Sequence, residues 1–361
     1  MRYVLAVLLA AVCFGTTGTA QALGPDADPL SVGAARLVIG GAALALIAGV
    51  QAAGRRREGI GTSSASPGGG AATRVRRTPS WVLVAIGAAG VLAYQPAFFA
   101  GTAANGVAVG TVVALGSAPV LTGALDWAVS RRFPGTRWAI ATAIATAGVA
   151  LLALASSGMG GAGGADGAVS SGAGASPLGL LASIGAGASY AVYTVAAKGL
   201  IDRGWTSTAS MGALFGIAGA ASLPVLLLTD ASWLATPEGI AMALWLGLVT
   251  TAIAYVLFGA GLRGLAPAAV STLTLAEPLT AGLLGVLLLG EVLSVEAWIG
   301  LAVLATGIVV LATGRRARAA AEQPQSPGTA DTAVSAADDS VPVWTSSSSP
   351  DSGSTHLPGS R

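Results

Sequence analysis

The sequence predicts an all-α integral membrane protein, with ten transmembrane helices arranged as two inverted five-helix repeats. Composition, ten long apolar runs and the sorting of charged residues along the chain support this fold class. Of 361 residues, 53% are hydrophobic and only 9% are charged, whereas about 25% of the residues in a soluble domain are charged. The low charge excludes an ordinary soluble protein, and the lipid bilayer is the expected partner.

The apolar runs are each close to the roughly 20 residues that a helix needs to cross the hydrocarbon core of a bilayer. The expected spans are residues 3–23, 30–53, 80–100, 106–130, 137–156, 177–199, 207–229, 238–261, 266–290 and 295–313. Four of them begin with a capping residue followed by proline, a pair that suits the start of a helix. These pairs are Asp28-Pro29, Thr78-Pro79, Ser176-Pro177 and Thr236-Pro237.

The first span has an alternative interpretation as a cleaved secretory signal. Arg2 precedes an apolar run, and Ala20-Gln21-Ala22 resembles a cleavage site. We expect a retained helix instead, because ten spans place both termini on the same side of the membrane, as the charge pattern requires.

The basic residues sort to alternate connections. With the amino terminus inside, all of them except Arg36 and Arg361 fall on the inner side. The opposite connections contain acidic residues instead: Asp26, Asp28, Asp166, Asp230, Glu238, Glu291 and Glu296. The positive-inside rule therefore places both termini in the cytoplasm. We expect the plasma membrane of the cell as the location. Because the basic residues form short clusters beside the spans, they give no indication of nucleic-acid binding.

Low-complexity segments define the expected domains. Residues 157–176 form a Gly/Ser/Ala-rich external linker between a first five-helix repeat, 1–156, and a second one, 177–313. Residues 314–361 contain too few apolar side chains for a core, so we expect a disordered cytoplasmic tail.

An internal repeat supports this division. "SAPVLTG" (117–123) aligns with "AEPLTAG" (276–282), which pairs Pro119 with Pro278 at an offset of 159 residues. The same offset pairs Gly148 with Gly307, and a second alignment places Ala93-Tyr94 over Ala254-Tyr255. Because five is an odd number of helices, the second unit must run inverted, an arrangement that suggests alternating access to a site between the halves.

The sequence offers no set of residues for catalysis or metal binding. Its one cysteine is Cys13, and its one histidine, His356, lies in the tail. We therefore expect neither an enzyme nor a cofactor or metal.

Glu277 is the main candidate for a functional residue, because it lies near the middle of the ninth span. A bare carboxylate at that depth is costly, so it must be protonated, paired or facing water. Either it is a structural acid bonded to a neighbouring helix, or it binds a solute or a proton. Pro278 removes one backbone hydrogen bond and leaves the carbonyl one turn back available; a plain packing kink is the alternative.

Arg36 lies about six residues inside the outer end of the second span. It either extends its side chain toward the interface or binds an anionic group of a solute or a buried acid. A direct pair with Glu277 is disfavoured, because the two differ in depth by roughly 10 Å. Asp126 is expected to be an interfacial charge.

Polar and aromatic side chains within the spans are the remaining candidates for a cavity lining. These are Thr17, Tyr94, Gln95, Ser117, Tyr190, Tyr193 and Tyr255.

The sequence also resembles a known family. "FGTTGTA" (14–20), "GAARLVIGGAAL" with Arg36, "SYAVYTVAAKGL" (189–200) and the stretch from "IAYVLFGAGLRGLAP" through "WIGLAVLATGIVVLA" look like the EamA family of the drug/metabolite transporter superfamily. Members of that family have ten spans in two five-helix repeats. The first repeat here departs from the pattern, with Ala118 and Arg132 where the second has Glu277 and Glu291.

The resemblance implies a secondary transporter that moves a small organic solute or metabolite, efflux included, with proton coupling as an option. The alternative is a membrane scaffold or regulatory protein that keeps the fold without transport.

Overall fold

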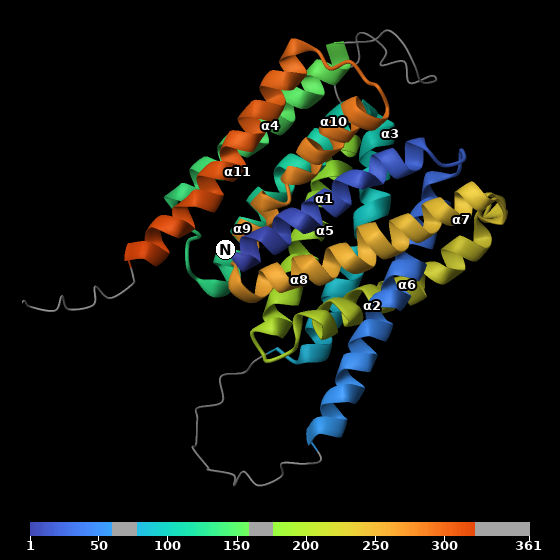
Figure 1. Ribbon diagram of the computed structural model, residues 1–361, viewed down its shortest axis with the longest axis vertical. Helices are drawn as coiled ribbons and strands as arrows, with labels where there is room; N and C mark the ends of the chain where they lie inside the picture. The colour runs from blue at the N-terminus through green and yellow to red at the C-terminus, as the bar shows by residue number, and fades with distance from the viewer. Residues whose placement is uncertain (60–77, 159–175, 322–361) are drawn as a thin grey trace, which may run out of the picture. The chain divides into compact units, whose positions relative to one another are not determined.

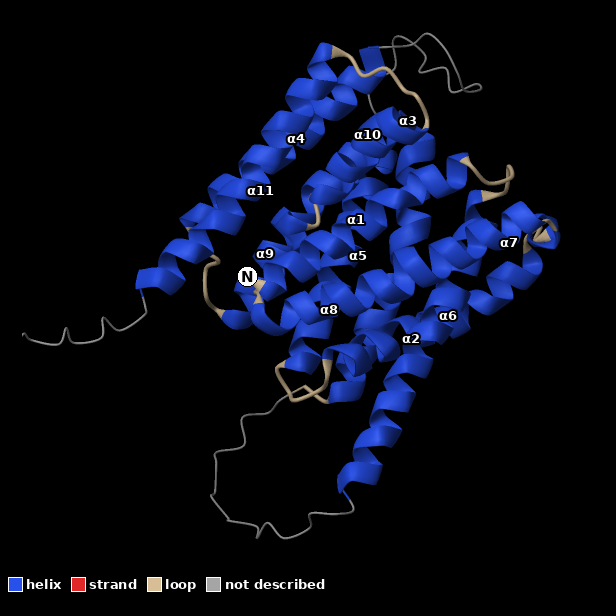
Figure 2. Cartoon of the chain, in the orientation of Figure 1, coloured by secondary structure: helices blue, strands red, loops and turns tan. Residues whose placement is uncertain are grey.

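The computed structural model describes residues 1–59, 78–158 and 176–321 (Figure 1). The basic connection after the second span, nearly all of the predicted linker and most of the predicted tail lie outside these residues. Helices and short connections make up the described part, which contains no strand (Figure 2).

Ten segments of the described residues are helical, long and apolar enough to cross a membrane, which confirms an all-α membrane fold. The helices are α1 (Arg2–Ala22), α2 (Pro29–Gly59), α3 (Ser80–Ser130), α4 (Thr136–Gly158), α5 (Pro177–Ile201), α6 (Ser207–Leu228), α7 (Pro237–Leu244), α8 (Ala254–Gly264), α9 (Pro267–Leu273), α10 (Ala276–Leu288) and α11 (Val295–Ala321). A 3₁₀ turn, η1 (Ser232–Ala235), precedes α7, and a π-helical segment, η2 (Trp245–Ile253), joins α7 to α8.

Three of the four predicted helix caps are formed. Asp28 accepts from the backbone N–H of Ser31 at 3.0 Å, and Thr236 accepts from that of Gly239 at 3.0 Å. Ser176 caps α5 in the same way. The prediction for Thr78 was wrong: α3 has no side-chain cap.

The third and fourth spans were expected as two helices joined by a short connection, and the segment labelled α3 contains both of them, Ser80–Val107 and Val109–Ser130. The chain passes from one span to the next at Gly106, whose φ of 80° and ψ of 155° are open to glycine and strained for other residues. The third span therefore extends to Val107, beyond the predicted end at residue 100.

The ninth span is interrupted in its middle. Helix α9 ends at Leu273, and α10 begins at Ala276. In the eighth span, the hydroxyls of Thr250 and Thr251 both donate to the Leu246 carbonyl, within the π-helical segment η2. Both irregularities lie at mid-span, a depth at which irregular backbone is tolerated only inside protein or beside a cavity.

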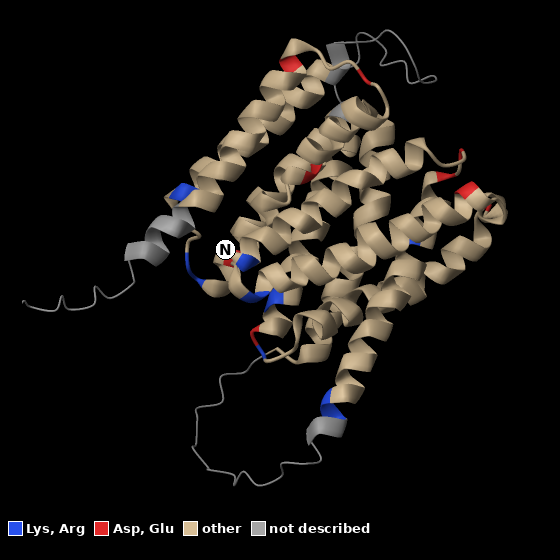
Figure 3. Cartoon of the chain, viewed as in Figure 1, with Lys and Arg blue, Asp and Glu red and all other residues tan. Residues whose placement is uncertain are grey.

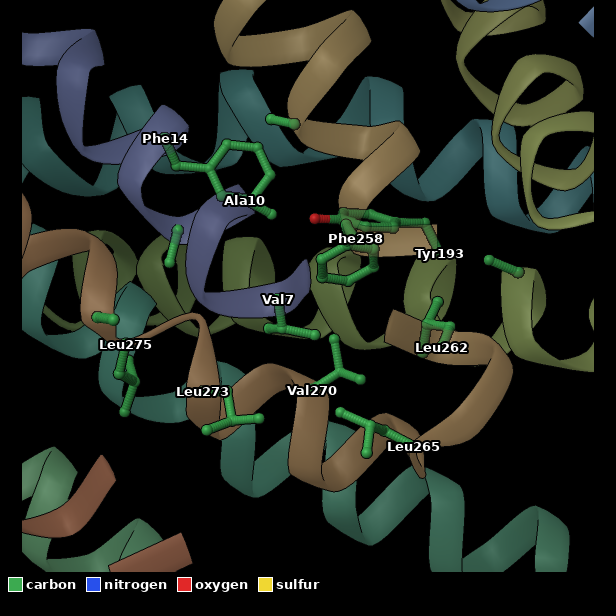
Figure 4. Close-up of a cluster of buried hydrophobic side chains, with 14 of the residues drawn as sticks. Val7, Ala10, Phe14, Tyr193, Phe258, Leu262, Leu265, Val270, Leu273 and Leu275 are labelled. Carbon is green, nitrogen blue, oxygen red and sulfur yellow. The ribbon is translucent and has the colours of Figure 1, made fainter. Parts of the chain in front are cut away.

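Helix α1 belongs to the packed core. It contacts α8 and α10, and Val7 and Ala10 are completely buried. In Figure 4, Val7 and Phe14 lie among side chains of α8 and α9 that include Phe258 and Leu273. This packing is expected of a retained helix rather than of a cleaved signal.

Helices α4 and α11 lie side by side (Figure 1) and meet through glycines. Gly148 of α4 lies against Leu304, and Gly307 of α11 lies against Ala145. Each of the two contacts maps onto the other when residue numbers are shifted by 159, the offset of the repeat. Two helices related by a local two-fold axis produce this reciprocal pattern.

The charged residues separate along the helices. Most Lys and Arg positions lie toward the lower part of the view in Figure 3, and most Asp and Glu positions lie toward the upper part. The predicted orientation of the termini remains a prediction, since it depends on which of these two sides faces the cytoplasm.

Candidate functional site

A partly open cavity, here called the main cavity, lies in the middle of the spans, among α1, α2, α3, α5, α8, α9 and α10. Its empty volume, including space open to solvent, is about 620 Å³. Seven of the ten candidate residues from the sequence line it. They are Arg36, Tyr94, Tyr190, Tyr193, Tyr255, Glu277 and Pro278.

A second cavity of about 350 Å³ adjoins the main one. The two cavities share four lining residues, Arg36, Tyr94, Tyr193 and Tyr255. Gln95 lines only the second cavity.

Two candidates lie in neither lining. The Ser117 hydroxyl donates to the carbonyl of Ala114 at 3.2 Å, where α3 packs closely on Gly187 of α5. Thr17 is half-buried on α1. Its neighbour Thr16 instead accepts a hydrogen bond from the Trp245 indole at 2.9 Å, so this part of α1 contributes to helix packing.

The break in the ninth span sets the position of Glu277. Glu277 lies in the first turn of α10, where the helix dipole favours a negative charge. The side chain is half-buried and lines the main cavity. Its carboxylate has no hydrogen bond or ion pair with any residue that the structure describes.

The backbone around Pro278 differs from the expectation in one respect. The Thr274 carbonyl lies one turn before Pro278, and we expected it to be available. It accepts a hydrogen bond from the Glu277 N–H at 2.9 Å instead. The tight turn at the start of α10 uses this acceptor, so Pro278 shapes the turn without leaving that carbonyl unbonded.

Arg36 is anchored at the π-helical segment of the eighth span. Its Nε donates to the Thr251 hydroxyl at 3.0 Å, and its Nη2 donates to the Thr250 carbonyl at 3.2 Å. The guanidinium is therefore held inside the protein rather than extended to the interface. Although Arg36 and Glu277 line the same cavity, the two form no ion pair.

Tyrosines form much of the wall. The Tyr190 hydroxyl bonds to Thr274 at 2.9 Å, and the Tyr193 and Tyr255 hydroxyls bond to each other at 3.1 Å. Tyr190 and Tyr193 also meet edge to face, with ring centroids 5.1 Å apart. These bonds satisfy the buried hydroxyls and hold the rings in place, as buried tyrosines require.

Sequence reasoning missed several lining or supporting residues. They are Phe14, Thr250, Thr251, Ser271, Thr274 and Leu275. The polar run Ser271-Thr272-Leu273-Thr274, in an otherwise apolar span, is a signal that could have located the break.

A charged and polar cavity at mid-depth among ten spans is typical of a membrane transport protein. The chain matches the sequence model of the EamA-like transporter family over residues 1–154 and 177–313. It therefore belongs to the EamA family and is a multi-pass membrane transporter.

Relatives agree with this assignment. The chain is 39% identical over 321 residues to the uncharacterized transporter YwfM of Bacillus subtilis (strain 168), a match that covers 89% of this chain and 97% of that protein. It is 33% identical over 136 residues to an uncharacterized transporter of Archaeoglobus fulgidus, covering 37% of this chain and 47% of that protein.

A solved structure described as "Crystal structure of protein" superimposes with a TM-score of 0.64 at 21% identity, over 88% of this chain and 98% of that one. At that identity the likeness shows the fold alone.

Proposed function

We propose that the protein is a secondary transporter that moves a small organic solute or metabolite across the plasma membrane by alternating access. The observation that carries the proposal is the carboxylate of Glu277. It lines a cavity at mid-span and lacks a bonding partner among the described residues. Within a bilayer, such a group is costly unless it binds a solute, a proton or water.

The moving parts in this proposal are the two five-helix units, 1–156 and 177–313. The reciprocal contact of α4 with α11 supports a two-fold relation between the units. Because five helices are an odd number, this relation inverts one unit with respect to the other. Rocking of one unit against the other then exposes the main cavity to each side of the membrane in turn.

Glu277 is the coupling group in this proposal. Its position at the start of α10 keeps the carboxylate at the cavity, where it gains a proton or contacts the solute in one state and releases it in the other. The nearby guanidinium of Arg36 is fixed to Thr250 and Thr251, so it supplies a permanent positive charge without neutralising the acid by direct contact.

The orientation has its own test. We propose that both termini are cytoplasmic and that the 157–176 linker is external, because the basic residues sort to one set of connections. A reporter that works only in the cytoplasm is expected to be active when fused after residue 318 and silent when inserted near residue 166. The reverse pattern contradicts the orientation.

Transport is tested with purified protein in proteoliposomes. Comparing metabolites of cells with and without the gene selects the solutes, and their flux is then measured at several pH values. Glu277→Gln keeps the size of the side chain but removes its titration, so we expect normal protein levels with a loss of flux or of its pH dependence. Glu238→Gln, at an exposed position, is the matched control and should transport normally.

Two outcomes would contradict the proposal. Absence of flux for every solute in the panel would favour a scaffold or regulatory protein. Normal flux with unchanged pH dependence in Glu277→Gln would show that the acid is structural.

A further inference from the structure

The second cavity differs from the main one in the chemistry of its own lining. Residues that line only this cavity are mainly apolar, namely Leu37, Val91 and Phe215, with Gln95 and Thr251 as the polar members. The Thr251 hydroxyl already accepts from Arg36 and donates to Leu246. Gln95 is therefore the side chain there that remains available for a ligand.

The Gln95 amide has no hydrogen bond with a residue in the described part of the chain. An amide carries two donors and an acceptor, and in the half-buried Gln95 these groups are open to a ligand. The side chain lies against Gly33 of α2, where a Cβ would meet the amide oxygen in its present position. The glycine thus leaves room for an amide that serves no structural bond.

The charges determine which end of a solute enters the second cavity. Arg36 lines both cavities, whereas Glu277 lines only the main one. A cationic group is attracted to Glu277 and repelled by Arg36, so it stays in the main cavity. The tyrosine rings of that cavity add favourable contacts with a cation.

We infer that the second cavity is a specificity subsite for a solute with an ammonium group at one end and a largely apolar, uncharged group at the other. The ammonium group lies at Glu277, and the uncharged group enters between Val91 and Phe215. Gln95 forms a hydrogen bond with a polar atom on that group. This inference rests on the proposed function, because it concerns the solute that the main cavity would carry.

Binding to the full-length protein in lipid nanodiscs tests the inference without requiring transport. The probes are ethylammonium, 2-phenylethylammonium, its 4-hydroxy derivative and uncharged 2-phenylethanol, measured by isothermal titration calorimetry. We expect 2-phenylethylammonium to bind at least about tenfold more tightly than 2-phenylethanol, because a charged hydrogen bond is lost in the neutral probe. Glu277→Gln should abolish that preference.

Two variants address the subsite itself. We expect the unmodified protein to bind the 4-hydroxy derivative roughly fivefold more tightly than 2-phenylethylammonium itself. Gln95→Met keeps the length of the side chain and removes its amide, so this difference in affinity should disappear. Val91→Phe fills the second cavity, so it should weaken the binding of 2-phenylethylammonium much more than the binding of ethylammonium. Gln51→Met, on the exposed part of α2, is the matched control. It should leave two affinity ratios unchanged: that of the hydroxylated probe to 2-phenylethylammonium, and that of 2-phenylethylammonium to ethylammonium.

Equal binding of the charged and uncharged probes, or no binding of any probe to the unmodified protein, would overturn the assignment of an ammonium solute. Unchanged probe ratios in both Gln95→Met and Val91→Phe would overturn the subsite. Because the two variants alter different side chains, misfolding of one leaves the other as a test. Probe binding as expected together with an absence of flux would instead remove the transport proposal and keep the binding site.

Discussion

The fourth and ninth spans correspond in the repeat, yet their backbones differ. The fourth span, Val109–Ser130, is a continuous helix through Pro119. The ninth span, Pro267–Leu288, is interrupted between α9 and α10, just before Pro278. Ala118 and Glu277, the residues before the two prolines, both line the main cavity.

This comparison shows that proline alone does not break the span. The ninth span has additional partners for its polar groups: Trp138 of α4 donates to the Ala268 carbonyl at 2.8 Å and to the Thr272 hydroxyl at 3.1 Å. Thr142 bonds to the same Thr272 hydroxyl at 2.8 Å. Contacts of this kind re-satisfy backbone and side-chain groups around an interruption. The break then places the acid at a helix start, where the dipole stabilises its charge.

Moving the carboxylate from the ninth span to the fourth should have the largest effect on transport. In the double variant Glu277→Ala/Ala118→Glu, we expect flux in proteoliposomes to stay at background, because residue 118 lies inside a continuous helix and lacks the stabilisation of a helix start. Ala118 is only 6% exposed, so its replacement also buries a new carboxylate and should lower the yield of folded protein.

Each single variant serves as a control for the double variant. Recovery of flux in the double variant, above that of Glu277→Ala alone, would show that the two positions are equivalent and that the break is irrelevant to function.

The second prediction concerns the stability of the contact between α4 and α11, the helices that follow the fourth and ninth spans. Gly148→Leu and Gly307→Leu should each lower the free energy of unfolding by about 1–3 kcal/mol, because a side chain at either position collides with the facing helix. Thermal unfolding in nanodiscs measures the change. Gly49→Leu, where nothing lies within 4 Å of an added Cβ, is the matched control. A large effect at one glycine and none at the other would contradict the reciprocal contact.

The smallest expected effect on stability comes from removing the hydrogen bonds that Trp138 donates to α9. The repeat offset pairs Trp138 with Ala297, so the other unit has no equivalent indole. Trp138→Phe removes two hydrogen bonds while keeping an aromatic ring, and should lower the free energy of unfolding by about 1–2 kcal/mol. Hydrogen exchange is expected to rise in α9 more than in α10. Trp127→Phe, at an exposed tryptophan of the same region, is the control.

Much of the candidate site was predictable because its residue types are conspicuous in a membrane span. Glu277 and Arg36 stood out as charges among apolar residues, and the four tyrosines stood out as side chains that need a partner. The predictions for Thr17 and Ser117 relied on polarity alone, and both residues lie outside the two cavity linings. A hydroxyl can bond to the backbone of its own helix, as Ser117 does, so its polarity does not reveal a cavity.

The sequence by itself determined the ten spans, because the transfer of a helix into lipid depends on the summed hydrophobicity of about 20 consecutive residues. It also determined three helix starts, since a cap is a contact between residues three apart. Only the tertiary structure decided the break before Glu277, the π-helical turn that holds Arg36 and the grouping of the tyrosines. Those features depend on partners such as Thr251 for Arg36 and Thr274 for Tyr190, which lie 215 and 84 residues away in the chain. Local pattern carries no information about contacts of that range, because they form only when the helices pack together.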